Sequence, residues 1–122
     1  MDLKQLSQSF SICKVKDIKD VDLNNQFVFV SHTDRECSVI CPTEIVPREC
    51  IEVEHGWNCF YIAEDAAFSK YGMIAFLADI IAKQKTGILV VATYDTDYIL
   101  IKEEKWEEVK TALYESGCRF VE

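Results

Sequence analysis

Two apolar runs of the sequence, residues 88–92 and 98–102, are separated by a short segment that is rich in hydrogen-bonding side chains. The four polar residues of this segment, with no glycine among them, are Thr93, Asp95, Thr96 and Asp97. Its two carboxylates could accept hydrogen bonds from an ammonium group. The alternative is a turn in which Asp95 and Thr96 bond their own backbone, and the residues alone favour this simpler interpretation.

A second group of residues could supply the opposite chemistry at the beginning of a helix predicted after Phe68. The first turn of a helix presents unpaired backbone N–H groups and a positive dipole end, which together attract a carboxylate. Gly72 would let a ligand approach the backbone closely, and Ser69 is a candidate N-cap residue. The helix start and the polar segment therefore predict two complementary half-sites for a free amino acid.

The elements that must position these half-sites occupy the second half of the chain. An aromatic-rich strand at 56–64 precedes an amphipathic helix at 71–85, in which Met73 and Ile74 belong to the apolar stripe. Strands at 88–92 and 98–102, a second amphipathic helix at 103–117 and a closing strand complete the series. This βαββαβ order predicts an α+β, ferredoxin-like unit with an antiparallel sheet and two helices on one face.

The first half of the chain is expected to form mainly strands. Alternating apolar residues indicate a strand at 10–15, and two further strands are expected within 26–33 and 36–46. Pro42 should end or bend the last of these, because proline cannot donate to a central ladder. Residues 48–56 contain several charged residues and end in a glycine, a composition typical of a junction between two structural elements.

Composition excludes several classes of function. The chain has 122 residues and a formal net charge of −8, which argues against binding to nucleic acid or to an anionic membrane surface. No apolar stretch is long enough to span a membrane, and the N-terminus has no apolar signal core, so a cytoplasmic protein is expected. In that compartment the six cysteines should be reduced thiols.

A cluster of cysteine and histidine residues invites a zinc or thiol-enzyme interpretation. Its members are His32, Cys37, Cys41, Cys50, His55 and Cys59. No C-x-x-C pair occurs, and the first two cysteines share one strand face with Val39, so core packing is expected instead. Both histidines are expected in polar turns. No metal, cofactor or catalytic residue is therefore predicted.

Three stretches of the sequence resemble the ACT domain family, in the branch of small stand-alone bacterial proteins, cytosolic arginine sensors of the CASTOR type and aspartokinase-like regulatory domains. They are "FVFVSHTDRECSVICPTEIVP", "GWNCFYI" and "FSKYGMIAFLADIIAKQKTGILVVATYDTDYILIKEE". The resemblance implies a degenerate ACT-like unit at 1–55 that precedes an ACT domain at 56–122. It also implies a homodimer and a ligand, usually an amino acid, that binds where two ACT units meet.

The resemblance assigns the ligand to the loop entering the first helix and to the polar segment. On this sequence the ligand-binding positions are Ser69, Tyr71, Gly72, Met73, Ile74, Thr93, Tyr94, Thr96 and Asp97. Lys70 departs from the acidic residue of the arginine sensors and would repel a guanidinium group. The expected function is a non-catalytic, small-molecule-binding regulatory or sensor module. A cysteine- or histidine-based metal-binding protein or thiol enzyme, and a ligand-free interaction domain, remain the alternatives.

Overall fold

The computed structural model describes residues 1–63 and 71–122. Its strands and α-helices are β1 (Asp2–Gln5), β2 (Phe10–Val15), β3 (Phe29–His32), β4 (Cys37–Pro42), β5 (Cys50–Ile62), α1 (Met73–Ala82), β6 (Leu89–Ala92), β7 (Asp97–Lys102), α2 (Trp106–Glu115) and β8 (Arg119–Phe120). Short 3-10 helices occur at Ile18–Asp20, Thr43–Ile45 and Glu103–Lys105. The chain divides into two compact units, which we call the helical unit (Met1–Ser7 and Asn58–Glu122) and the strand unit (Gln8–Trp57).

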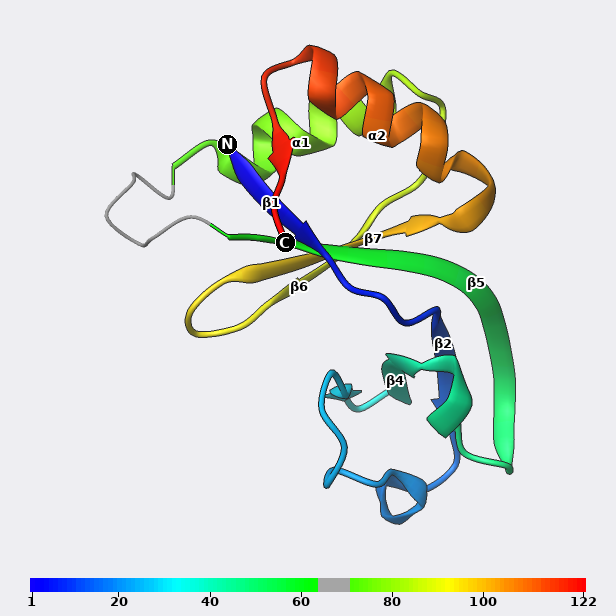
Figure 1. Ribbon diagram of the computed structural model, residues 1–122. Coiled ribbons are helices and arrows are strands. Elements are labelled where there is room, and N and C mark those ends of the chain that lie inside the picture. The colour runs from blue at the N-terminus through cyan, green and yellow to red at the C-terminus, as the bar shows by residue number, and fades with distance from the viewer. Residues whose placement is uncertain (64–70) are drawn as a thin grey trace. The chain divides into compact units, whose positions relative to one another are not determined.

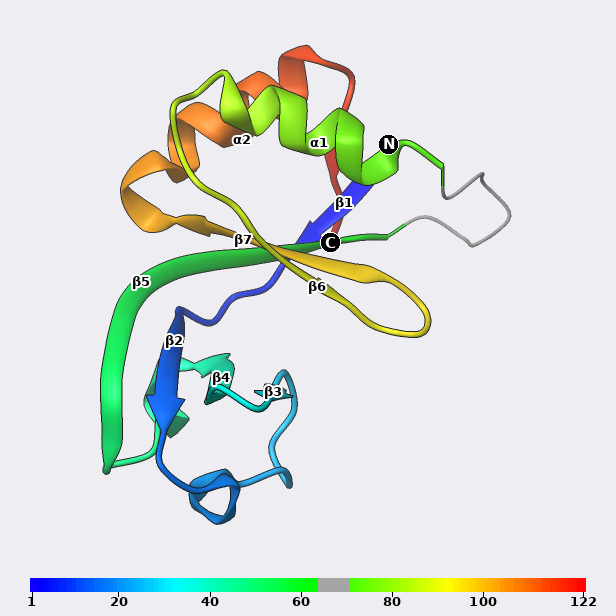
Figure 2. The same cartoon turned by 180° about the vertical axis from the view of Figure 1, so that it is seen from behind.

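The helical unit contains the βαββαβ series of β5, α1, β6, β7, α2 and β8. Its strands lie in the order β6-β7-β5-β1-β8, and helices α1 and α2 lie on the same face of them (Figures 1 and 2). The predicted α+β, ferredoxin-type fold is thereby confirmed. None of the helices among the described residues is long and apolar enough to cross a membrane.

Strand β1 is the element that the sequence did not predict. It lies between β5, with which it is antiparallel, and β8, with which it is parallel. The expectation of a purely antiparallel sheet built from 57–122 alone is therefore wrong, because a strand from the N-terminus separates the first and last strands of that series. The expected division into 1–55 and 56–122 also differs from the structure, since residues 1–7 belong to the helical unit.

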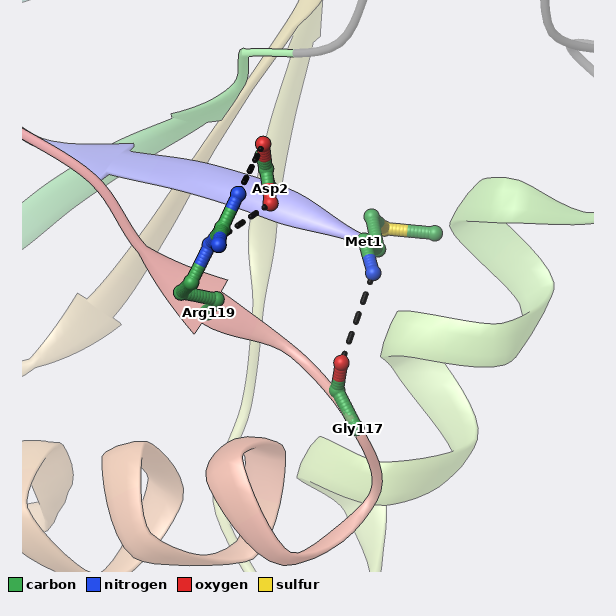
Figure 3. Close-up of polar contacts among 4 residues, drawn as sticks. All are labelled: Met1, Asp2, Gly117 and Arg119. Atoms are coloured by element: carbon green, nitrogen blue, oxygen red, sulfur yellow. Dashed lines mark hydrogen bonds and ion pairs between the residues drawn. The ribbon is translucent and has the colours of Figure 1, made fainter.

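Main-chain and side-chain hydrogen bonds fix β1 in this position. Ala63 N–H donates to the carbonyl of Asp2 at 2.8 Å on one side, and Val121 N–H donates to the carbonyl of Leu3 at 2.8 Å on the other. The guanidinium of Arg119 donates to both oxygens of the Asp2 carboxylate, Nε to Oδ1 at 3.2 Å and Nη2 to Oδ2 at 3.1 Å (Figure 3). The same figure shows the N-terminal amine of Met1 near the carbonyl of Gly117, at 3.4 Å.

The core of the helical unit lies between the sheet and its two helices. Phe60, Trp106 and Phe120 pack as an aromatic cluster with ring centroids 5.5–5.8 Å apart, at spacings typical of favourable edge-to-face and tilted pairs. Phe120 is partly buried, and the buried residues of this core besides Phe60 and Trp106 are Leu3, Ile62, Leu77, Ile80, Ile81, Ile99, Ile101, Val109, Leu113 and Cys118. The helical periodicity seen in the sequence places three of these on the inner face of α1.

The strand unit is an antiparallel arrangement in the order β3-β4-β2-β5. Strand β2 has the predicted bounds, and β4 ends at Pro42 as expected. The strand predicted within 26–33 begins only at Phe29. Phe27 has a φ of 61°, which is outside the extended region and delays the start of the strand.

The predicted junction at 48–56 is wrong, because β5 runs without a break from Cys50 to Ile62. Gly56 has a φ of 86°, and the pairing of β5 with β2 shifts register between Trp57 and Glu54. A β-bulge with glycine in the left-handed region explains both observations. The glycine that suggested a junction therefore marks an irregularity within one strand.

Candidate functional site

The polar segment after β6 forms a tight turn that two threonines hold together. Thr93 N–H donates to the Thr96 carbonyl at 2.8 Å, and the Thr93 hydroxyl donates to the same carbonyl at 2.8 Å. Thr96 N–H in turn donates to the Thr93 hydroxyl at 3.2 Å. The sequence-based alternative assigned this self-bonding to the side chains of Asp95 and Thr96. That assignment is wrong, because the Thr93 side chain satisfies the turn and the Thr96 hydroxyl donates to Ile62 instead.

The two carboxylates of this turn are left available by this arrangement. Asp97 begins β7 opposite Ala92 and is half-buried, whereas Asp95 is exposed at the tip. Neither carboxylate forms a hydrogen bond or an ion pair with another residue in the part of the chain that the structure describes. A half-buried carboxylate without a partner is less well solvated than one at the tip, so a cationic ligand group would gain more from Asp97 than from Asp95.

The start of α1 provides backbone donors. Gly72 is the N-cap residue with a φ of 80°, a conformation that glycine adopts without strain, and its carbonyl accepts from Phe76 N–H at 2.8 Å. The helix therefore starts two residues later than predicted. Ser69 is not its N-cap, and Ser69 itself lies outside the described residues. No side chain caps this helix, so its first N–H groups have no side-chain partner among the described residues.

The apolar and aromatic residues of the predicted site divide into two groups. Met73 and Ile74 pack against the core of the helical unit, so they could offer a ligand their backbone more readily than their side chains. Tyr71 and Tyr94 are 94% and 98% exposed. Both tyrosine rings are therefore exposed at the surface.

The helix start and the turn lie at the same end of the helical unit, where β5 finishes (Figures 1 and 2). The Thr96 hydroxyl donates to the carbonyl of Ile62 at 3.0 Å, which ties the turn to the last residue of β5. Among the described residues, the hydrogen bonds of the turn reach β5 and not α1. Sequence reasoning missed Ile62, because a backbone carbonyl leaves no signal in the residue type.

Two of the buried cysteines, Cys59 and Cys41, are poor candidates for a catalytic nucleophile. Burial raises the pKa of the Cys59 thiol to about 12, and burial together with the nearby Cys13 raises the pKa of Cys41 to about 11. Such thiols are almost fully protonated near neutral pH, and the thiolate is the reactive form. Among residues 1–63 and 71–122, no group of three or more histidine, cysteine or acidic residues is arranged to hold a metal ion.

His55 has a structural partner in the strand unit. Its Nδ1 lies 2.7 Å from the hydroxyl of Ser11, which is fully buried and also lies 2.7 Å from the hydroxyl of Thr43. The prediction that His55 stands in a polar turn is wrong, because it lies within β5. A serine with no exposed surface cannot reach a substrate, so the pair cross-links strands and forms no catalytic dyad.

Comparison with known proteins adds to this geometry. The family model described as "ACT domain" matches residues 52–115. A comparison with curated proteins gave no match. Among solved structures, a protein from Agobacterium tumefaciens is similar at 26% identity and a TM-score of 0.87, over 98% of this chain and 91% of its own.

Two more distant structures share the fold. A protein of unknown function from Vibrio cholerae is 16% identical with a TM-score of 0.72, over 93% of this chain and 88% of its own. The regulatory subunit of aspartate kinase from Thermus thermophilus, in a ligand-free form, is 9% identical with a TM-score of 0.66, over 94% of this chain and 97% of its own. At these identities the likeness concerns the fold alone.

Proposed function

Since the chain belongs to the ACT domain family, we propose that it is a non-catalytic regulatory or sensor module whose helical unit binds a free amino acid. Family membership supports a small-molecule-binding regulatory role. The observation that carries the proposal is the match over 52–115, which includes the start of α1 and the β6–β7 turn. We also propose that the strand unit is a truncated, ACT-like companion of the helical unit.

The geometry of the helical unit supports an amino acid as the ligand. An amino acid carries a carboxylate and an ammonium group a few ångströms apart. The N–H groups at the start of α1, which no described side chain caps, suit the carboxylate, and the Asp97 carboxylate suits the ammonium. The binding positions in this proposal are Ser69, Tyr71, Gly72, Met73, Ile74, Thr93, Tyr94, Thr96 and Asp97.

A thermal-shift screen tests the proposed function. A ligand that binds the folded state alone stabilises it by about 2.7 kcal/mol at a concentration one hundred times its Kd. We expect one or a few of the twenty amino acids to raise Tm, while nucleotides and EDTA leave it unchanged. A fall in Tm with EDTA would instead favour the metal-binding alternative, and a flat response to all amino acids would favour the ligand-free interaction domain.

A homodimer is proposed as the assembly that completes the site. Strand β6 pairs only with β7 among the described strands, so its other edge is open, and Val90 on this strand is 42% exposed. An open edge with an exposed apolar residue is a surface on which a second chain can pair.

The dimer proposal predicts that Val90→Lys converts the protein to monomers. A buried, unpaired ammonium at an interface is costly, so light scattering at tens of micromolar should give the mass of one chain. Tyr114→Lys is the matched control, because Tyr114 is 75% exposed on α2 and away from β6. A parent protein that is already monomeric would contradict the proposed dimer, and a dimeric Val90→Lys variant would place the contact elsewhere.

A further inference from the structure

Four of the cysteines line one face of the strand unit. Cys13, Cys37 and Cys41 are 1–7% exposed and pack with Val15 and Val39 in one core cluster. Cys50 is only half-buried and packs against the same cluster. All four are free thiols. The proposed amino-acid site, which belongs to the helical unit, uses none of them.

The strand registers place Cys13 at the centre of this group. Val39 of β4 lies opposite Cys13, so Cys37 and Cys41 are its diagonal neighbours on that strand. Cys50 of β5 lies opposite Val15, so it is a diagonal neighbour of Cys13 on the other side. The pKa of Cys13 reflects this proximity. Burial raises that pKa most, the charge of a Cys50 thiolate raises it next, and that of Cys37 raises it less.

Cys50 differs from the other three thiols in two respects. It is the least buried thiol of the cluster, so a dissolved oxidant meets it first. It also lies at a register shift, because Lys14 pairs with Glu52 but the next residue, Val15, pairs with Cys50. An extra residue in one strand loosens the ladder locally, so β5 can adjust there more easily than β4 can.

We propose that Cys50 and Cys13 form an oxidation site, in which a hydroperoxide converts the two thiols into a disulfide that joins β2 to β5. The Cys50 thiolate attacks the peroxide, the O–O bond breaks, and Cys50 becomes a sulfenic acid while the peroxide is reduced to water or an alcohol. The Cys13 thiol then displaces the sulfenic hydroxyl as water, and the S–S bond forms. Two thiols lose two electrons and two protons, which the hydroperoxide accepts.

The geometry explains why the pair is free in the reduced protein and can still close. Diagonal neighbours in a sheet have Cα atoms about 7–8 Å apart, slightly beyond the usual disulfide limit of about 6.8 Å. Closure therefore needs a movement of about 1 Å between the strands, and the irregularity of β5 at Cys50 is where such a movement costs least. Cys37 and Cys41 lie on β4, which pairs with β2 without a register shift.

Hydrogen peroxide treatment of the whole protein, followed by digestion under non-reducing conditions and mass spectrometry, tests this proposal. We expect a linked peptide that contains Cys13 and Cys50, with the loss of two hydrogen atoms per chain and full recovery on reduction. Cys50→Ser should abolish the linked peptide. Cys13→Ala should leave the sulfenic acid on Cys50, where dimedone traps it.

Cys41→Ala is the matched control, since Cys41 is as buried as Cys13 and belongs to the same cluster. This variant should still form the Cys13–Cys50 peptide. If Cys13→Ala does not fold, the half-buried Cys50→Ser variant still decides the matter. A parent protein whose Cys50 stays reduced, or whose linked peptides join other cysteines, overturns the proposal.

Discussion

Replacing Leu3 with alanine should lower the free energy of unfolding by about 2–5 kcal/mol, the range for a large aliphatic side chain removed from a core. Leu3 has no exposed surface and lies in the core of the helical unit. It stands opposite Ile62 of β5 on one side and opposite Phe120 of β8 on the other. The loss therefore affects the contacts of three strands at once. Urea denaturation of parent and variant measures the effect.

Arg119→Ala is the control for this experiment. It removes the ion pair that Arg119 makes with Asp2 on the same two strands (Figure 3), but both side chains are solvent-accessible and water replaces most of the interaction. We expect a much smaller change than for Leu3→Ala. Equal changes in the free energy of unfolding of the two variants would mean that surface interactions hold β1 in the sheet and that Leu3 contributes little to the core.

The sequence could not reveal β1 for a physical reason. Its four residues, "DLKQ", contain one apolar side chain, and a strand is recognised by alternation over a longer run. The strand forms because β5 and β8 offer hydrogen bonds on both sides, and those partners lie about sixty and more than a hundred residues away in the chain. Propensity is a weak guide where such tertiary pairing decides the structure.

The elements that position the proposed site were easier to predict. The apolar periodicity of α1 and the two apolar runs around the turn depend on local patterns, and the structure places them within two or three residues of the expected bounds. The sequence could not predict which hydrogen bonds hold the turn. The roles of Thr93 and of the Ile62 carbonyl depend on backbone geometry, which residue types do not determine.

Changing Asp97 to asparagine should weaken binding of the amino acid found by thermal shift by about 1.5–3 kcal/mol, the range for a hydrogen bond to a charged group. Folding should be nearly unaffected, because the Asp97 carboxylate bonds no other residue in the described part of the chain and the threonines hold the turn. Titration calorimetry and melting curves of the two proteins separate these effects.

Asp95→Asn is the matched variant, since it removes the same charge two residues away, at the exposed tip of the same turn. If the ligand ammonium is bound at Asp97, the Asp95 variant should bind almost as well as the parent, apart from a small long-range effect that salt screens. Equal weakening in both variants would indicate general electrostatic attraction and no specific contact. Two variants that bind like the parent would show that the amino-acid site does not include this turn, and its unpaired carboxylates would then be a solvated surface.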